Sequence, residues 1–198
     1  MVFARGQSIR SHESPLLIAV KFDQVAAIET LLELGADVDF VYKDCCPLIL
    51  AIQNGSVEAV KLLLKFNANV NITTDFSGMT PIHWASFEEN IEIIELLINA
   101  GANVNQKDLD GETPLLSCHR VFHSSAETVE CLLKHGADPN IHGDISPLQR
   151  FVLNNDIASV KLLIEAGANL KHRNKRGYTA LMYAERDQLQ EMIEILKR

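Results

Sequence analysis

The sequence contains little of what membrane, secreted or metal-binding proteins need. No run of 18 apolar residues occurs, and the first fifteen residues lack the apolar stretch and cleavage site of a secretory signal. The four cysteines, Cys45, Cys46, Cys118 and Cys131, include no C-x-x-C pair, which argues against a disulfide framework or a zinc ribbon. Reduced thiols of this kind predict a cytoplasmic protein, with the nucleus as the alternative.

Excess positive charge is also missing. The formal net charge is −8, whereas nucleic acids and anionic membranes both attract a cationic face. The sequence therefore predicts neither nucleic acid nor membrane as the main partner. Hydrophobic residues make up 47% of the chain and charged residues 22%, so the composition is that of a globular protein.

No pattern of catalytic residues stands out. The glycines are single, so no loop is suited to cradling a phosphate. His119 follows Cys118, but neighbours on a helix do not face each other, as a nucleophile and its base must. A metal site from Cys118, His119, His123 and Cys131 is conceivable by count, yet the spacing matches no common zinc pattern. We expect a non-enzymatic protein without metal or cofactor.

An internal repeat dominates the sequence instead. Five prolines and one alanine recur at steps of 32, 34, 33, 33 and 33, each preceded by Ser, Cys or Thr: Pro15, Pro47, Pro81, Pro114, Pro147 and Ala180. A second marker follows about twenty residues later, as in LLINAGANVN from Leu96. A repeat of this length is typical of solenoids, in which each unit buries its apolar face against its neighbours.

These markers resemble the ankyrin repeat, with its period of about 33 and its T-P-L-H-x-A signature. The best copy is GMTPIHWASFEENIEIIELLINAGANVN, from Gly78 to Asn105. The resemblance implies an all-α ankyrin-repeat solenoid of stacked antiparallel helix pairs, joined by hairpin-like turns and curved around a concave binding face. It implies a single domain over residues 1–198, with repeats at approximately 12–44, 45–77, 78–110, 111–143, 144–176 and 177–198.

The third unit shows the local physics. Pro81 suits a first helical turn and Thr80 suits the N-cap before it, so a helix is expected over 81–87 and a second over 91–99. Ile93, Ile94, Leu96 and Leu97 should face inward. Gly101 should then end the second helix in the left-handed conformation, and Asn67 should do so one unit earlier.

Departures from the repeat mark where this chain is individual. The fourth unit carries two extra residues around 120–125, between its helices. The third unit alone keeps the full T-P-x-H, and the resemblance implies that His83 is a structural residue bonded within its own turn. Arg150 either reaches solvent or pairs with an acid. The first unit is apolar, and we expect the opening residues near Val2, Phe3 and Ile9 to cover it.

The resemblance also implies a partner, which is another protein. Ankyrin proteins usually bind through turn tips and the exposed side of the first helices, and we expect this chain to be a monomer by itself. The residues predicted to contact the partner are Phe40, Tyr42, Phe76, Met79, Phe87, Glu88, Leu109, Arg120, Arg173 and Lys175. Aromatic residues and methionine are enriched at interfaces, although each of them could instead pack on a neighbouring unit.

Three functions remain open at this point. The first is a module that binds, bridges or sequesters a partner, as inhibitors of transcription factors and kinases do. The second is a substrate-receptor or adaptor subunit of a ubiquitin ligase, which usually needs an appended box after the repeats. The third, an enzyme, has no segment to itself, because the repeats fill the sequence. We expect the first.

Two surface features complete the predictions. Asn71 and Asn105 follow G-A-[DN]-V-like turns with a leucine eight residues earlier, so the resemblance implies candidate sites of asparagine hydroxylation. The alternative is an unmodified asparagine that stabilises its turn. The basic run Lys171–Arg176 is either a solvated turn or a contact for an acidic partner segment, and the acidic cluster Glu88–Glu95 has the same two interpretations.

Overall fold

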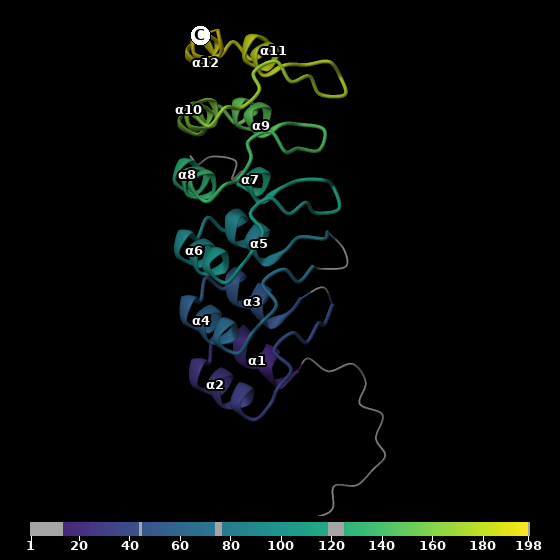
Figure 1. The fold of residues 1–198 in the computed structure, drawn as a ribbon, viewed down its shortest axis with the longest axis vertical. Coiled ribbons are helices and arrows are strands. Elements are labelled where there is room, and N and C mark those ends of the chain that lie inside the picture. The colour runs from purple at the N-terminus through teal and green to yellow at the C-terminus, as the bar shows by residue number, and fades with distance from the viewer. Residues whose placement is uncertain (1–13, 44, 74–76, 119–124, 198) are drawn as a thin grey trace, which may run out of the picture.

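A computed structural model describes residues 14–43, 45–73, 77–118 and 125–197. Over these residues the chain forms six pairs of short helices (Figure 1). The pairs are α1 Pro15–Lys21 with α2 Val25–Glu33, α3 Pro47–Gln53 with α4 Val57–Lys65, α5 Pro81–Phe87 with α6 Ile91–Asn99, α7 Pro114–Ser117 with α8 Ala126–Lys134, α9 Pro147–Leu153 with α10 Ile157–Glu165, and α11 Ala180–Arg186 with α12 Gln190–Leu196.

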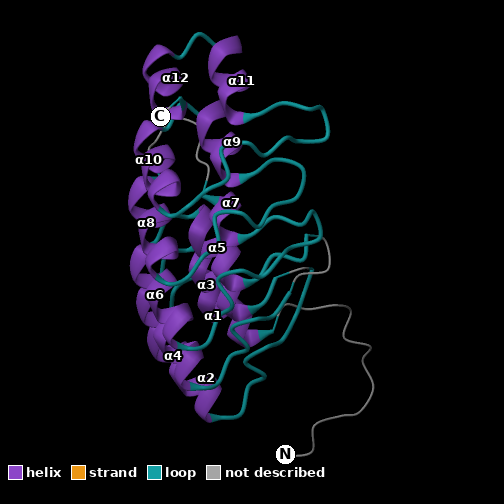
Figure 2. Cartoon of the chain, turned by 45° about the horizontal axis from the view of Figure 1, so that its top comes forward, coloured by secondary structure: helices purple, strands orange, loops and turns teal. Residues whose placement is uncertain are grey.

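The pairs stack into one column with two layers. The first helices of successive pairs contact one another, from α1 through α11, and the second helices form a parallel layer from α2 through α12. Figure 2 shows that the connections between pairs project away from the helices on one side. This is the solenoid that the repeat predicts. The described residues include no helix that combines the length and hydropathy needed to cross a bilayer.

Each first helix begins where the repeated Ser/Thr-Pro predicts. Proline occupies the first turn of α1, α3, α5, α7 and α9, where its missing N–H would have had no helical partner. In α1 the preceding hydroxyl caps the helix: Ser14 Oγ accepts a hydrogen bond from the backbone N–H of Leu17, over 3.1 Å. The predicted helices 81–87 and 91–99 coincide with α5 and α6.

Left-handed residues follow the helices at two slots that recur among the described repeats. Gly101 has φ +93°, and Asn67 has φ +62° at the equivalent slot, as predicted. The second slot follows the first helix and holds Gly55 in one repeat but Asp23, Glu89, Asn155 and Gln188 in others, all with positive φ. The repeat therefore imposes this conformation even on Glu89 and Gln188, whose residue types do not favour it.

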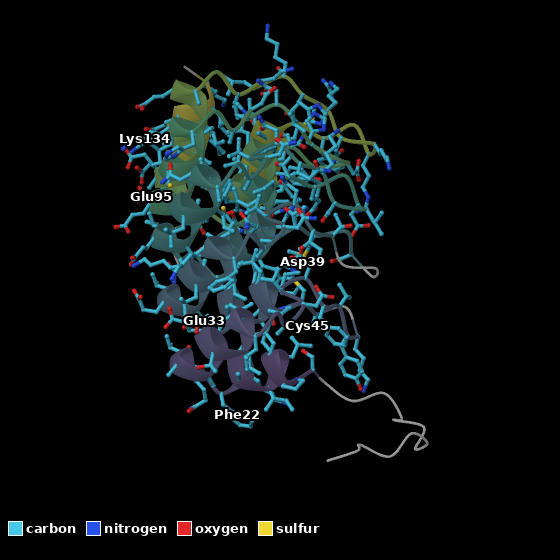
Figure 3. The ribbon with its side chains drawn as sticks, turned by 60° about the horizontal axis from the view of Figure 1, so that its bottom comes forward. Phe22, Glu33, Asp39, Cys45, Glu95 and Lys134 are labelled. Atoms are coloured by element: carbon cyan, nitrogen blue, oxygen red, sulfur yellow. The ribbon has the colours of Figure 1, made fainter. Side chains whose placement is uncertain are left out.

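The core lies between the two layers and between successive pairs. In α6, Ile93, Ile94 and Leu97 are fully buried, while Leu96 is partly buried and packs against the same core. The first pair differs, because no described repeat precedes it. Phe22 and Leu34 are exposed there, by 65% and 79%, and Figure 3 shows Phe22 at this free end. Val2, Phe3 and Ile9, which we expected to cover the first unit, lie outside the described residues.

The fourth repeat departs from the others in its first helix. Helix α7 is four residues long, whereas the other first helices have seven. It ends at Ser117, and Cys118 follows with backbone angles outside the helical region. The extra residues of this repeat begin directly afterwards, and positions 119–124 lie outside the described residues.

Candidate partner-binding surface

The connections between repeats form hairpin-like turns without regular strands in the described residues. Tyr42 and Cys45 exchange two backbone hydrogen bonds of 2.9 and 3.1 Å, which makes an isolated bridge. The N–H of Asp108 donates to the carbonyl of Glu112 over 2.9 Å in a later turn. These bonds hold each turn as a projecting tip.

Several predicted contact residues occupy the same position of the repeat, in the connection before each first helix. Counting five residues back from each proline slot gives Tyr42, Phe76, Leu109, His142 and Lys175. Three apolar or aromatic residues therefore precede a histidine and a lysine along the column. Phe76 lies outside the described residues.

Leu109 is exposed at its tip, with 72% of its surface accessible. Its N–H donates to the carbonyl of Ser77 in the previous turn, over 2.9 Å. Its side chain lies over Gly78, where an added Cβ would come within 2.8 Å of Leu109 Cγ. Met79 follows Gly78 and is half-buried. The structure thus brings Leu109 next to the segment that carries Met79.

A second aromatic pair lies on α5. Trp84 and Phe87 are one helical turn apart, and their rings meet edge to face with centroids 6.3 Å apart. Phe87 is 37% exposed and Trp84 is partly buried. Glu88, the C-cap of α5, is half-buried beside them. Aromatic side chains on a first helix are suited to contacting a partner.

Phe40 and Tyr42 occupy the first turn. Phe40 is half-buried and lines a hollow of about 340 Å³ with Pro15, Leu31 and Leu34. Tyr42 is half-buried, and Lys43 Nζ lies 5.2 Å from the centre of its ring. No recorded contact between described residues joins Tyr42, Leu109 and Phe87, so their union in one patch stays a prediction.

The structure decides between the alternatives for Arg150. Its guanidinium forms a partly buried salt bridge with Glu112, which lies in the turn before α7, one repeat earlier. The pair links α9 to that turn across neighbouring repeats. Arg120, the predicted contact one repeat earlier, lies outside the described residues.

Arg173 and Lys175 lie in the last connection and are exposed. Arg173 Nη1 donates to the carbonyl of Gly177 over 2.7 Å, and the N–H of Lys175 donates to Asp144 Oδ1 over 2.8 Å. They belong to the fifth repeat, whereas Phe87 and Leu109 belong to the third. The predicted contact residues thus fall into separate clusters.

His83 is structural, as predicted. Its Nδ1 accepts a hydrogen bond from the backbone N–H of Thr80, over 3.1 Å, and its Nε2 lies 3.2 Å from the carbonyl oxygen of Glu112. Because Nδ1 accepts, the proton must lie on Nε2, which donates to that carbonyl. Burial lowers the pKa of His83, and the hydrogen bond to Glu112 opposes the shift.

Gln149 occupies the same slot in the fifth repeat and makes the same bonds. Its Oε1 accepts from the N–H of Ser146 over 3.1 Å, and its Nε2 donates to the carbonyl of Tyr178 over 2.7 Å. Glutamine has no titratable group. The chain therefore contains its own pH-insensitive replacement for His83.

This equivalence predicts the effect of His83→Gln on pH-dependent stability. The folded-state pKa of His83 lies below its ordinary value of 6.5, so the unfolded chain binds the proton more strongly. His83 therefore costs stability progressively as the pH falls below about 6.5. We expect His83→Gln to change the free energy of unfolding at pH 7 by less than about 1 kcal/mol. Denaturation between pH 7 and 5 should show a smaller loss than in the wild type.

The reciprocal variant is Gln149→His, which places an imidazole in the same buried slot of the fifth repeat and should make the loss of stability at acid pH larger. His172 contributes in the same direction as His83, because burial and then the neighbouring His142 lower its pKa. The His83→Gln variant should consequently keep part of the acid sensitivity. Identical pH profiles for His83→Gln and the wild type would contradict the assignment.

Asn71 and Asn105 belong to a series of side chains that tie each turn to the next repeat. Asn71 Oδ1 accepts from the N–H of Asn103 over 3.1 Å, and Asn105 Oδ1 accepts from the N–H of Asp138 over 2.8 Å. The Asn105 amide also donates to the carbonyl of Gly136 over 2.9 Å. We call the four residues of this series the rung residues: Asp39, Asn71, Asn105 and Asn140. This is the turn-stabilising role, and hydroxylation stays a prediction.

Three of the four cysteines lie in surroundings that disfavour reactivity. The described cysteines form no disulfide, and burial raises the pKa of Cys46 to about 11. Burial likewise raises the pKa of Cys118 and of Cys131. Because the thiolate is the nucleophile, these shifts disfavour reactivity. The described residues contain no group of three or more metal-ligating side chains, and His119 and His123 lie outside them.

The second helices of the pairs form the outer layer, and charged side chains lie on their exposed face. Figure 3 shows Glu95 and Lys134 on this side of the column. Lys61 bridges to Glu92 over 3.2 Å, and Lys65 to Glu29 over 3.5 Å, each across neighbouring repeats. Solvated pairs of this kind contribute little stability, but they keep the outer face polar.

Comparison with known proteins agrees with this architecture. The family described as "Ankyrin repeats (3 copies)" matches residues 16–108, 48–143 and 118–198, which together span all six helix pairs. The chain belongs to the ankyrin-repeat family. Ankyrin repeats are in general protein–protein interaction modules, so the family points to a protein partner without identifying it.

Three relatives show how this ankyrin chain compares in length. An ankyrin repeat protein of Acanthamoeba polyphaga mimivirus is 28% identical over 182 residues, which cover 89% of this chain and 19% of the viral protein. Ankyrin repeat protein nuc-2 of Neurospora crassa is 35% identical over 128 residues, covering 63% and 12%. Phosphocholine transferase AnkX of Legionella pneumophila is 30% identical over 206 residues, covering 100% and 18%. The chain spans less than a fifth of each relative.

Sequence reasoning left two features of this ankyrin surface incomplete. Pairing with an acid was one of two alternatives for Arg150, but the sequence did not identify Glu112 as that acid. The first repeat was expected to be apolar and covered by the opening residues, and the structure shows Ile18, Phe22 and Leu34 exposed there.

Proposed function

We propose that this chain is a non-catalytic module that binds a partner protein through its turn tips and first helices. The observation that carries the proposal is the exposed apolar surface on those elements. Leu109 on a tip and Phe87 on α5 are exposed, while Tyr42, Met79 and Trp84 are only partly buried. Large apolar side chains are costly to leave in water unless a partner covers them.

Two further observations support this choice over catalysis. The thiols of Cys46, Cys118 and Cys131 are buried and have raised pKa values, and the described residues hold no cluster of metal ligands. The match to the phosphocholine transferase covers only 18% of that protein, so its named activity does not carry over to this chain. The reduced thiols also support a cytoplasmic or nuclear location as part of the proposal.

The test combines affinity capture with a tip variant. A partner captured from cell extract by the wild type should be retained poorly by Leu109→Asp. The new charge would be desolvated at the interface, which should weaken binding by roughly tenfold or more. Melting temperature should hardly change, because Leu109 is largely exposed.

The control is Ala27→Asp, which places the same charge at an exposed position of α2, in the layer of second helices. It should bind like the wild type. If Ala27→Asp weakens binding and Leu109→Asp does not, the partner contacts the second helices. That result would contradict the proposed surface.

A further inference from the structure

The last connection differs in charge from the rest of the protein. No Asp or Glu occurs between Ala166 and Ala184, whereas this stretch contains four cationic residues, Lys171, Arg173, Lys175 and Arg176. Earlier connections carry acids such as Asp37, Asp108 and Asp138. In a chain with a net charge of −8, this connection is therefore a local cationic site.

A groove opens beside this connection in the last repeat. Its volume is about 560 Å³, and it lies between the connection, the start of α11 and the end of α12. The aliphatic lining comes from Leu170, Leu181 and Leu196, and the cations come from Lys171, Arg173 and Lys197. The groove thus combines an apolar floor with a positively charged rim.

Arg173 is held so that one edge of its guanidinium remains available. Nη1 donates to the carbonyl of Gly177 over 2.7 Å and lies 3.9 Å from the sulfur of Met182. Nε and Nη2 face no recorded acceptor within the residues that the structure describes. These two donors form the edge that binds a carboxylate through two parallel hydrogen bonds.

The other two cations differ in how far they are already neutralised. Lys197 pairs with Glu185 over 3.4 Å, so its charge is partly balanced. Lys171 is exposed, and no carboxylate of the described residues is recorded within ion-pairing distance of its side chain. Lys171 and Arg173 therefore provide most of the uncompensated positive charge at the rim.

We propose that this groove binds an acidic segment of a partner protein, with leucine-like side chains on the floor and neighbouring Asp or Glu on Arg173 and Lys171. An aliphatic floor and a cationic rim complement these two features together. A nucleic acid fits less well, because the lining has no aromatic ring for base stacking and the whole chain repels polyanions. The groove lies where the fifth and sixth repeats meet, so the inference does not depend on the surface around α5 and Leu109.

The experiment measures fluorescence anisotropy with the complete chain and a fluorescein-labelled peptide, Glu-Asp-Leu-Glu-Glu-Leu-Asp. A second peptide replaces both leucines with serine, and a third replaces every acid with its amide. Each change should weaken binding by about tenfold, because one removes burial of apolar surface and the other removes charge-assisted hydrogen bonds. Equal binding of the first two peptides would show that charge alone accounts for binding, without burial of the leucines, and would overturn the inference.

Protein variants test the site itself. Arg173→Glu should weaken binding of the acidic leucine peptide by about tenfold or more, and Arg173→Lys should weaken it less, because lysine keeps the charge but loses the two-donor edge. The matched control is Lys107→Glu, which makes a similar charge reversal at the same register of an earlier turn and should change binding less than about twofold. Melting temperatures should stay similar, since both side chains are exposed.

Two results would overturn the inference. One is equal loss of binding in Lys107→Glu and Arg173→Glu, which would indicate attraction to the chain as a whole. The other is tighter, Arg173-dependent binding of labelled single-stranded DNA, which would make a nucleic acid the occupant. Failure of the peptide to bind at about millimolar concentration would overturn it as well.

Discussion

Leu97→Ala should destabilise the fold by about 3–5 kcal/mol. Leu97 is fully buried in α6, in the third of six repeats, so it packs against repeats on both sides. Truncation removes apolar contacts and leaves a cavity that the surrounding helices close only partly. Chemical denaturation should show this as a lower free energy of unfolding at an unchanged denaturant slope.

Leu196→Ala is the matched control, because Leu196 occupies the same slot in α12 at the end of the column. It is also buried, but it has a described repeat on one side only. In a stack held by nearest-neighbour contacts, the loss there should be smaller, at about 2 kcal/mol. Equal losses at the two positions would contradict this account of how neighbouring repeats share the core.

Trp84→Ala should cost about 3 kcal/mol of folding free energy, whereas Phe87→Ala should cost about 1 kcal/mol or less. Trp84 is the more buried of the pair, and its indole nitrogen has no hydrogen-bond partner among the described residues, so the loss reflects packing alone. Phe87 is more exposed and contributes mainly the edge-to-face contact. Thermal denaturation of both variants measures the difference.

Binding should rank the two variants in the opposite order once each is corrected for its folded fraction. Phe87→Ala should weaken binding to the captured partner by about 2 kcal/mol, or roughly thirtyfold, if Phe87 anchors the interface. A Phe87→Ala variant that melts as early as Trp84→Ala would show instead that Phe87 belongs to the core. A variant that binds like the wild type would place the interface elsewhere.

The repeat made the helices predictable because each boundary has a local chemical cause. Pro81 after Thr80 starts α5, and Gly101 ends the unit in the left-handed conformation. Asn67 at the equivalent slot keeps that conformation, which its tolerance of positive φ allowed us to predict. The second slot was harder, because Glu89 and Gln188 adopt positive φ without any residue preference for it. Only aligning these positions with Gly55 could have revealed that the second slot requires a positive φ.

The surface was less predictable because it depends on contacts between repeats. The sequence left Arg150 with two alternatives, and the structure decided between them through Glu112, which lies 38 residues earlier in the chain. Leu109 could be predicted as a tip residue from its register, but its position over Gly78 depends on how two turns of different length meet. Phe76 and Arg120 lie outside the described residues, so their part in the surface stays a prediction.

The rung residues have a mechanical consequence. Each bonds the start of its own turn to the backbone of the following repeat, so short side chains fix the spacing between successive turns. A partner that contacts several turns would therefore meet contact points at nearly constant intervals, which would favour partners whose own contact points have the same spacing.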